Sequence, residues 1–186
     1  DAALQRAGAV RATTIQQLFA AATLLSTPQR VRGNRIAIVT NGGGPGVMAT
    51  DRAVDLGVQL AELSATTLAR LDAALPAAWS RGNPFDVLGD ASAERYRNAV
   101  QACLEDPAVD GVLVMLTPQA MTDPTACAEA VVEARAGHNK PVLACWMGEQ
   151  QVQQANRHFA QHQLPSFTSP ESIVEAFAYL SSYYHN

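Results

Sequence analysis

A short apolar run leads directly into a glycine-rich turn and a helix-like segment, and this order constrains the fold more than any other feature. Ile36–Val39 are four consecutive apolar residues, as in a strand buried on both faces. Four glycines follow, at Gly42, Gly43, Gly44 and Gly46. Glycine reaches backbone angles that other residues avoid and lets a ligand approach the main chain. Proline suits the first position of a helix, so we expect the helix to begin at Pro45.

This strand–turn–helix unit has two interpretations, and the residues leave both open. The free N–H groups of a first helical turn, together with the positive end of the helix dipole, form a site for a phosphate or a carboxylate. Alternatively, the glycines only allow the strand and the helix to pack closely. The spacing Gly-Gly-Gly-Pro-Gly is neither the G-x-G-x-x-G dinucleotide motif nor a P-loop, since no lysine follows the glycines.

Composition excludes several classes of function. The chain has 186 residues, of which 48% are apolar and 16% charged, with a formal net charge of −4. This charge and the scattered basic residues argue against a nucleic-acid surface. No apolar run approaches the ~20 residues of a membrane span, and no signal peptide is evident. We therefore expect a cytoplasmic protein without nucleic-acid or membrane partners.

The cysteines and the chain ends add two expectations. Cys103, Cys127 and Cys145 form no C-x-x-C pair and lie among apolar residues, which favours buried free thiols in a reducing compartment. The chain starts at Asp1 without methionine, and Tyr179–Asn186 ends without a capping signal. We expect a piece of a longer polypeptide.

Strand and helix signals alternate along the whole chain. Helix caps are expected at Thr13 or Thr14 and at Ser64, Ser92 and Asp123. Strands are expected near residues 35–40, 58–60, 83–87, 111–116, 141–145 and 166–167. The alternation predicts an α/β fold with a parallel sheet of about five strands and helices on both faces. We place an N-terminal helical arm at residues 1–33 and the main domain at residues 34–186.

In such sheets, ligands bind beyond the carboxyl ends of the strands. The loops expected there are Asn41–Gly46, Val87–Asp90, Thr117–Asp123 and Trp146–Glu149.

Polar residues in and beside these loops have a functional and a structural interpretation. Asp86 and Asp90 can orient a neighbouring group or simply form a turn. Asn83 is either a contact residue or an ordinary turn residue. Thr117 and Gln119, with Thr122, offer a weaker second site for an anion or a polar ligand. Trp146 and Met147 fit an exposed interface, although core packing is more common.

The histidines do not form a catalytic or metal-binding set. His158 and His162 are four residues apart on an expected helix, a spacing that can bind metal, but no third ligand is evident. A solvated helix face is the favoured interpretation. His138 and His185 lie in a polar turn and in the C-terminal tail. We expect no metal site in this chain.

Five segments of the chain carry a family resemblance: Asp1–Val10 (DAALQRAGAV), Asn34–Asp51 (NRIAIVTNGGGPGVMATD), Gly82–Asp90 (GNPFDVLGD), Val112–Pro124 (VLVMLTPQAMTDP) and Lys140–Gly148 (KPVLACWMG). They resemble the NDP-forming acyl-CoA synthetases, which include the ADP-forming acetate–CoA ligases. The likeness is greatest to bacterial forms fused to a GNAT protein acetyltransferase. The order of elements resembles the ligase-CoA domain, as in the C-terminal domain of the succinyl-CoA synthetase β subunit. This implies a flavodoxin-like, doubly wound sheet.

The resemblance implies a mechanism. Acyl-CoA and phosphate give an acyl phosphate, a histidine takes the phosphoryl group, and a nucleoside diphosphate receives it. A glycine turn and helix N-terminus stabilise the phosphohistidine. The matching phosphate-binding residues are Asn41, Gly42, Gly43, Gly44, Pro45, Gly46 and Val47. The candidate loop for the substrate or the phosphohistidine comprises Asn83, Asp86, Thr117, Pro118, Gln119, Ala120 and Met121.

The resemblance also implies that essential parts lie outside this chain. The phosphorylated histidine comes before the position of Asp1, so the chain alone is expected to be inactive. The full-length protein is expected to use CoA, ATP or ADP, and Mg²⁺, with CoA-binding and ATP-grasp domains as partners. The alternative is a non-catalytic, acyl-CoA-sensing regulatory domain of a GNAT protein lysine acetyltransferase.

Overall fold

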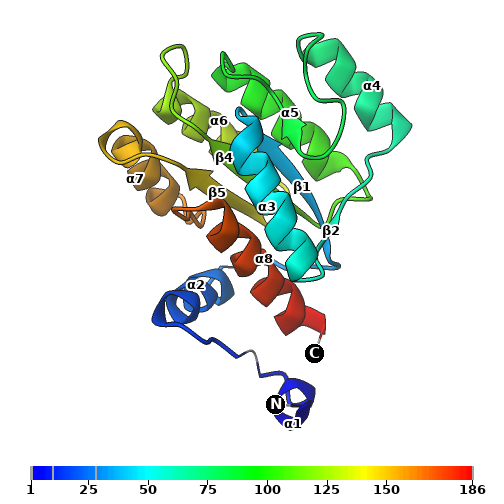
Figure 1. Ribbon diagram of the computed structural model, residues 1–186, viewed down its shortest axis with the longest axis vertical. Helices are drawn as coiled ribbons and strands as arrows, with labels where there is room; N and C mark the ends of the chain where they lie inside the picture. Colours follow the sequence, from blue (N-terminus) through cyan, green and yellow to red (C-terminus); the bar gives the residue numbers. More distant parts are fainter. Residues whose placement is uncertain (1, 10, 28, 186) are drawn as a thin grey trace.

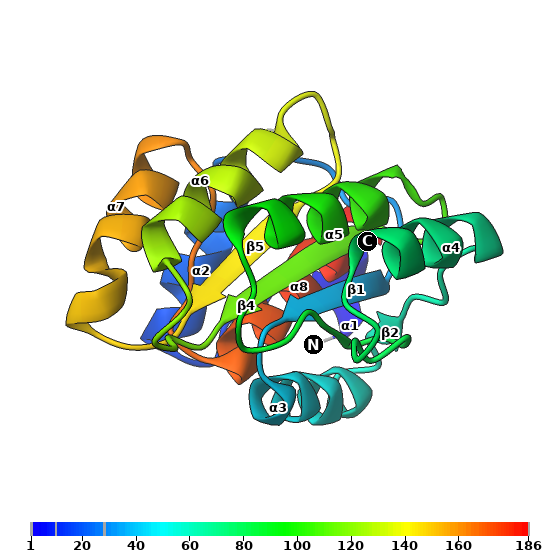
Figure 2. The same cartoon turned by 90° about the horizontal axis from the view of Figure 1, so that it is seen from above.

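The computed structural model shows a parallel β-sheet between two layers of helices (Figures 1 and 2). It describes residues 2–9, 11–27 and 29–185. One face of the sheet is covered by α3 (Gly43–Asp55) and α8 (Pro170–His185). The opposite face is covered by α4 (Ala65–Ala74), α5 (Ala93–Glu105) and α6 (Pro124–Arg135), with α7 (Gln153–Gln161) beside α6. The expected α/β fold is confirmed.

The order of the strands creates a switch point in the middle of the sheet. The strands are β1 (Arg35–Thr40), β2 (Gln59–Leu60), β3 (Phe85–Asp86), β4 (Gly111–Leu116) and β5 (Val142–Trp146). The sheet order is β2–β1–β4–β5, and all pairs are parallel. β3 also pairs with β1, beyond the point where β2 stops. After β1 the chain first builds one side of the sheet and then the other, so the order reverses between β1 and β4.

Short polar side chains begin four of the described helices, as the sequence predicts. Thr14 caps α2 (Ile15–Leu25) in a capping box with Gln17. Ser64, Ser92 and Asp123 cap α4, α5 and α6 through hydrogen bonds to free backbone N–H groups. Each such cap stabilises its helix by about 1 kcal/mol.

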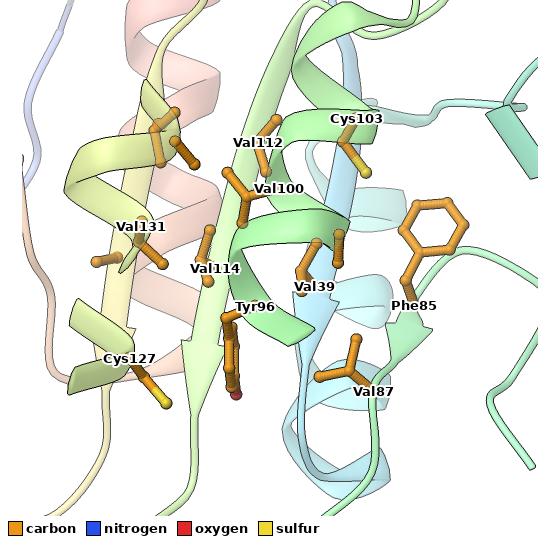
Figure 3. Close-up of a cluster of buried hydrophobic side chains, with 14 of the residues drawn as sticks. Val39, Phe85, Val87, Tyr96, Val100, Cys103, Val112, Val114, Cys127 and Val131 are labelled. Carbon is orange, nitrogen blue, oxygen red and sulfur yellow. The ribbon is translucent and has the colours of Figure 1, made fainter. Parts of the chain in front are cut away.

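The strands are buried on both sides, and side chains of α5 and α6 complete one of the two cores. Figure 3 shows Val112 and Val114 of β4 facing Tyr96 and Val100 of α5 and Val131 of α6. The Tyr96 hydroxyl donates to the Met115 carbonyl at 2.9 Å, which ties α5 to β4. Burial raises the pKa of Tyr96 well above its ordinary value.

Trp146 and the cysteines belong to the core as well. The Trp146 ring packs edge-on against Phe159 with ring centroids 4.8 Å apart, and its Nε1 donates to the Pro124 carbonyl at 2.8 Å. Core packing is therefore the correct interpretation of this residue. The three cysteines are buried and free, as expected, and burial raises the pKa of each thiol to about 12.

Some element boundaries differ from expectation. α3 begins at Gly43 rather than at Pro45. The first helical turn needs no internal N–H donors, so proline is tolerated at its third position as well as at its first. Ser166 forms only an isolated bridge with Ala144 instead of a strand. A 3₁₀ turn, η1 (Gln150–Val152), precedes α7.

The N-terminal segment consists of two helices that are placed differently. α2 packs against α8, and Leu24 is fully buried there. α1 (Ala2–Arg6) lies away from the sheet in Figure 1. Asp1, Val10, Pro28 and Asn186 lie outside the described residues. Among the helices described, none has the length and apolar character needed to cross a membrane.

Candidate anion site at the glycine turn

The glycine turn and the loop after β4 meet at the switch point of the sheet. β1 ends at Thr40 and β4 at Leu116, so the loops that follow them leave the same edge side by side. Asn41 joins these loops through its side chain, which is only 2% exposed. Its Oδ1 accepts from the Thr117 N–H at 2.7 Å, and its Nδ2 donates to the Thr117 carbonyl at 2.9 Å. The Asn41 amide thus fixes the geometry of the site.

Thr40 shapes the turn from the other side. Its hydroxyl donates to the Gly42 carbonyl at 2.9 Å and accepts from the Gly42 N–H at 3.2 Å. Sequence reasoning did not single out Thr40. A hydroxyl residue two positions before a glycine is a recognised turn signal and could have identified it.

The four glycines serve different purposes. None has a positive φ, so the turn uses their missing side chains rather than their backbone freedom. A Cβ on Gly46 would lie 3.3 Å from both Pro84 Cβ and Thr40 Cγ2, which supports the packing interpretation there. A Cβ on Gly42 would lie 3.2 Å from Thr117 Oγ1. Gly43 and Gly44 are exposed, and a Cβ on Gly44 would meet nothing within 4 Å.

The open part of the turn presents two backbone donors. α3 begins at Gly43, so the N–H groups of Gly43 and Gly44 have no partner inside the helix. Pro45 has no N–H, and the Gly42 N–H is held by Thr40. Gly46 and Val47 come late enough for their N–H groups to join the regular helical pattern. Of the seven predicted phosphate-binding residues, Gly43 and Gly44 therefore provide the free amides.

Thr117 supplies a third polar group beside these amides. Its Oγ1 is buried and has no hydrogen-bond partner among the described residues. It lies close to Gly42, as the short distance to a Cβ there shows. Buried hydroxyls are nearly always paired, so this one, next to Gly42, still has a hydrogen bond to offer to a polar group.

Asp86 gives the rim of this site a negative charge. Its Oδ1 accepts from the Leu88 N–H at 2.9 Å. Its Oδ2 lies 3.7 Å from the position that a Cβ on Gly43 would take. A carboxylate repels a simple anion but accepts a hydrogen bond from an N–H or O–H group. The site therefore suits an occupant that carries an anionic group and a hydrogen-bond donor together.

The remaining residues of the predicted second loop support its shape. The Thr122 hydroxyl donates to the Gly89 carbonyl at 2.9 Å. The Gln119 amide packs so closely on Gly89 that a Cβ on Gly89 would lie 2.6 Å from Gln119 Oε1. Pro118 lies against Gly148 in the same way. Ala120 and Met121 are exposed, and Met121 has 78% of its surface accessible.

Asn83 has a structural position that the sequence did not reveal. Its Oδ1 accepts from the Ile38 N–H at 3.0 Å, and its Nδ2 donates to the carbonyls of Ile36 and Ala61. The side chain thereby bonds backbone groups of β1 in the gap between its pairing with β2 and its pairing with β3. Asp90 is similarly engaged, since Arg95 donates to its Oδ1 at 2.7 Å; this hydrogen bond, the main cause, lowers the pKa of Asp90.

No metal centre accompanies the site in the part of the chain that the structure describes. No group of three His, Cys, Asp or Glu residues there could hold a metal ion. The rings of His158 and His162 lie 4.2 Å apart on α7, away from the glycine turn, which follows β1.

Comparisons with known proteins identify the family of this chain. The profile of the Ligase-CoA domain matches residues 36–185. The acetate–CoA ligase [ADP-forming] I of Archaeoglobus fulgidus is 40% identical over 182 residues, which are 98% of this chain and 25% of that protein. Subunit alpha of the acetate–CoA ligase [ADP-forming] II of Pyrococcus furiosus is 33% identical over 181 residues, 95% of this chain and 39% of that subunit.

A solved structure extends the likeness to the fold. The dinucleotide forming acetyl-coenzyme A synthetase 1 of Ca. Korarchaeum cryptofilum, in complex with phosphate and ADP, matches with a TM-score of 0.92 and 28% identity. The match covers 99% of this chain and 40% of that one. The chain thus spans about a quarter to two-fifths of the length of these relatives. It belongs to the Ligase-CoA domain family.

Proposed function

We propose that this chain is one domain of an ADP-forming acyl-CoA synthetase and that its glycine turn holds a phosphohistidine from a neighbouring domain. The whole protein would convert an acid, CoA and ATP into acyl-CoA, ADP and phosphate. An acyl phosphate and the phosphohistidine would be the intermediates. CoA-binding and ATP-grasp domains would supply the CoA and the Mg²⁺–nucleotide sites, and the protein would work in the cytoplasm.

The observation that carries this proposal is the set of unpaired donors at the switch point. The N–H groups of Gly43 and Gly44 have no partner inside the helix, and the Thr117 hydroxyl has none among the described residues, so all three can donate to phosphoryl oxygens. The positive end of the α3 dipole adds to their effect. Asp86 at the rim can accept the remaining ring N–H of a phosphorylated imidazole. A phosphohistidine thus satisfies the donors and the carboxylate together, whereas free phosphate satisfies only the donors.

The relatives support the same role. Those described above are named as ADP-forming ligases or as an acetyl-coenzyme A synthetase, and one was solved with phosphate and ADP. None of the four histidines of this chain lies in the glycine turn or in the loop after β4. The reacting histidine would therefore come from another part of the protein.

Phosphate binding by the isolated chain tests the site directly. We expect ³¹P NMR to show binding of inorganic phosphate to the 186-residue chain. Gly44→Val should abolish this binding without unfolding the protein, because a Cβ on Gly44 meets nothing within 4 Å and the bulky side chain then stands on the residue that donates one of the two free amides. Gly82→Val is the matched control, since a Cβ there meets only one atom within 4 Å, at 3.9 Å. Unchanged phosphate binding in Gly44→Val would count against the proposal.

A second experiment separates catalysis from the regulatory alternative. An acyl-CoA-sensing domain of a GNAT protein lysine acetyltransferase would keep the fold but would not need the histidine. The sequence of the full reading frame distinguishes the two functions. A histidine in the loop upstream of Asp1, together with ³²P transfer from ATP to that histidine, supports the ligase. A different residue there, with acyl-CoA binding but no phosphoryl transfer, supports the sensor.

A further inference from the structure

A basic cleft opens at the edge of the sheet opposite to the glycine turn. It has a volume of about 790 Å³ and is formed by three segments that lie at the amino ends of the strands. The first runs from Arg30 to Arg35 and leads into β1. The second is Pro107–Asp110 before β4, and the third is Gly137–Lys140 before β5. Small-molecule sites typically occupy about 300–1,000 Å³.

The cleft has an excess of positive charge. Arg30, Arg32, Arg35 and Lys140 line it, and Asp110 is the one carboxylate among the described residues that does. Four positive charges against one negative charge leave an excess of three, in a chain whose net charge is −4. This acidic protein thus has four of its 13 lysine and arginine residues in this one cleft.

Two of these cations are already used to build the cleft. The Arg35 guanidinium donates to Asp110 Oδ2 at 2.8 Å and to Oδ1 at 3.0 Å, and its backbone N–H donates to the same carboxylate. The Lys140 ammonium donates to the Asp106 carbonyl at 2.5 Å. These contacts hold the loops before β1, β4 and β5 together.

Arg30 and Arg32 are not used in this way. Both side chains are exposed, and neither has an ion pair or hydrogen bond within the described ranges of the chain. They lie two residues apart on an extended segment, on either side of Val31, which is buried in the core. The buried valine anchors this segment and thereby holds both arginines at the cleft.

We propose that this cleft binds a small molecule carrying a diphosphate group, with Arg30 and Arg32 as its principal ligands. Planar guanidinium groups present paired donors that match phosphate oxygens, and such charge-assisted hydrogen bonds are strong. Two unpartnered arginines and the remaining N–H groups of Lys140 suit two adjacent phosphates better than one. The occupant is distinct from that of the glycine turn, because β1 separates the two places by roughly 17–20 Å.

Calorimetric titration of the 186-residue chain with inorganic pyrophosphate tests the proposal. Arg30→Gln and Arg32→Gln should each weaken binding at the cleft about tenfold, and the double variant should lose the binding that survives in Gly44→Val. Both side chains are exposed, so the variants should keep the unfolding temperature of the original chain. Arg157→Gln is the matched control, since Arg157 is exposed on α7 and forms no ion pair within the described part of the chain. It should bind pyrophosphate like the original chain.

Three outcomes would overturn the proposal. Equal affinity in the double variant and the original chain would show that the arginines are not ligands. Loss of binding in Gly44→Val, with retention in the double variant, would place pyrophosphate at the glycine turn instead. Tighter binding of tetraglutamate than of pyrophosphate would identify the cleft as a docking place for an acidic polypeptide. Binding that survives Gly44→Val and is lost in the double variant supports the cleft, whether or not the proposed ligase function holds.

Discussion

Thr117→Val removes a buried hydroxyl that has no hydrogen-bond partner among the described residues, while the side chain keeps almost the same shape. In the absence of a ligand, this change costs no hydrogen bond and relieves the desolvation penalty of an unsatisfied group. The free energy of unfolding should rise by about 1 kcal/mol. For a domain of this size, that corresponds to an increase of about 2–4 °C in Tm.

The same change should weaken phosphate binding, because the hydroxyl is one of the three donors of the proposed site. Loss of one hydrogen bond to a charged group weakens binding about tenfold. At a phosphate concentration ten times the original Kd, bound phosphate stabilises the original chain by about 1.4 kcal/mol. In Thr117→Val, this stabilisation should fall to about 0.4 kcal/mol. Thermal unfolding with and without phosphate measures both effects.

Thr122→Val is the control with the opposite sign. The Thr122 hydroxyl donates to the Gly89 carbonyl at 2.9 Å, so its removal leaves that carbonyl unpaired. The variant should lose about 1–3 kcal/mol of stability and keep the full response to phosphate. If Thr117→Val were less stable than the original chain and responded equally to phosphate, the hydroxyl would have a structural partner, and our assignment would be refuted.

Three further predictions address the core and the pH dependence. Gly111→Ala should destabilise the protein by about 1–3 kcal/mol in urea unfolding, because the new Cβ would lie 2.4 Å from Phe177 Cε2 inside the core; an unchanged midpoint would contradict this packing. Burial opposes ionisation of Asp110, but hydrogen bonds from Arg35 outweigh it and lower the pKa of Asp110. The contribution of Asp110 to stability should be complete above the pKa of an unfolded aspartate, about 3.9, and should be lost as the pH falls through its lower folded pKa. In urea unfolding at a series of pH values, Asp110→Asn should lack this part of the acid transition. Finally, the three thiols, with pKa values raised to about 12, should react with a disulfide reagent at pH 8 only after unfolding; rapid reaction in the native state would show that they are not buried.

The local signals in the sequence predicted the elements well. The caps at Thr14, Ser64, Ser92 and Asp123 depend on side chains and amides only two or three residues apart. The strand Gly111–Leu116 was predicted with its correct boundaries, because a continuous apolar run between polar turns has little alternative in a sheet covered on both faces. The start of α3 was missed by two residues, since proline is acceptable throughout a first helical turn.

The roles of single polar side chains were harder to predict. Asn83 and Asp86 looked alike as loop residues near a strand end. In the structure, Asn83 bonds to backbone groups of β1 and of Ala61, whereas Asp86 stands at the open rim of the glycine turn. Which of the two lies beside the glycine turn depends on how β3 aligns with β1, more than 40 residues earlier in the chain.

The sequence by itself determined the succession of strands and helices and the place of a glycine turn at the end of the first strand. Apolar runs, helix caps and glycines act over a few residues, so their effect can be read without knowing the fold. Only the tertiary structure decided that the Thr117 hydroxyl is left without a partner among the described residues beside that turn, and that Arg30 and Arg32 join Lys140 around a cleft. These arrangements depend on segments about 75 to 110 residues apart meeting across the sheet, which hydrophobic burial imposes on the chain as a whole.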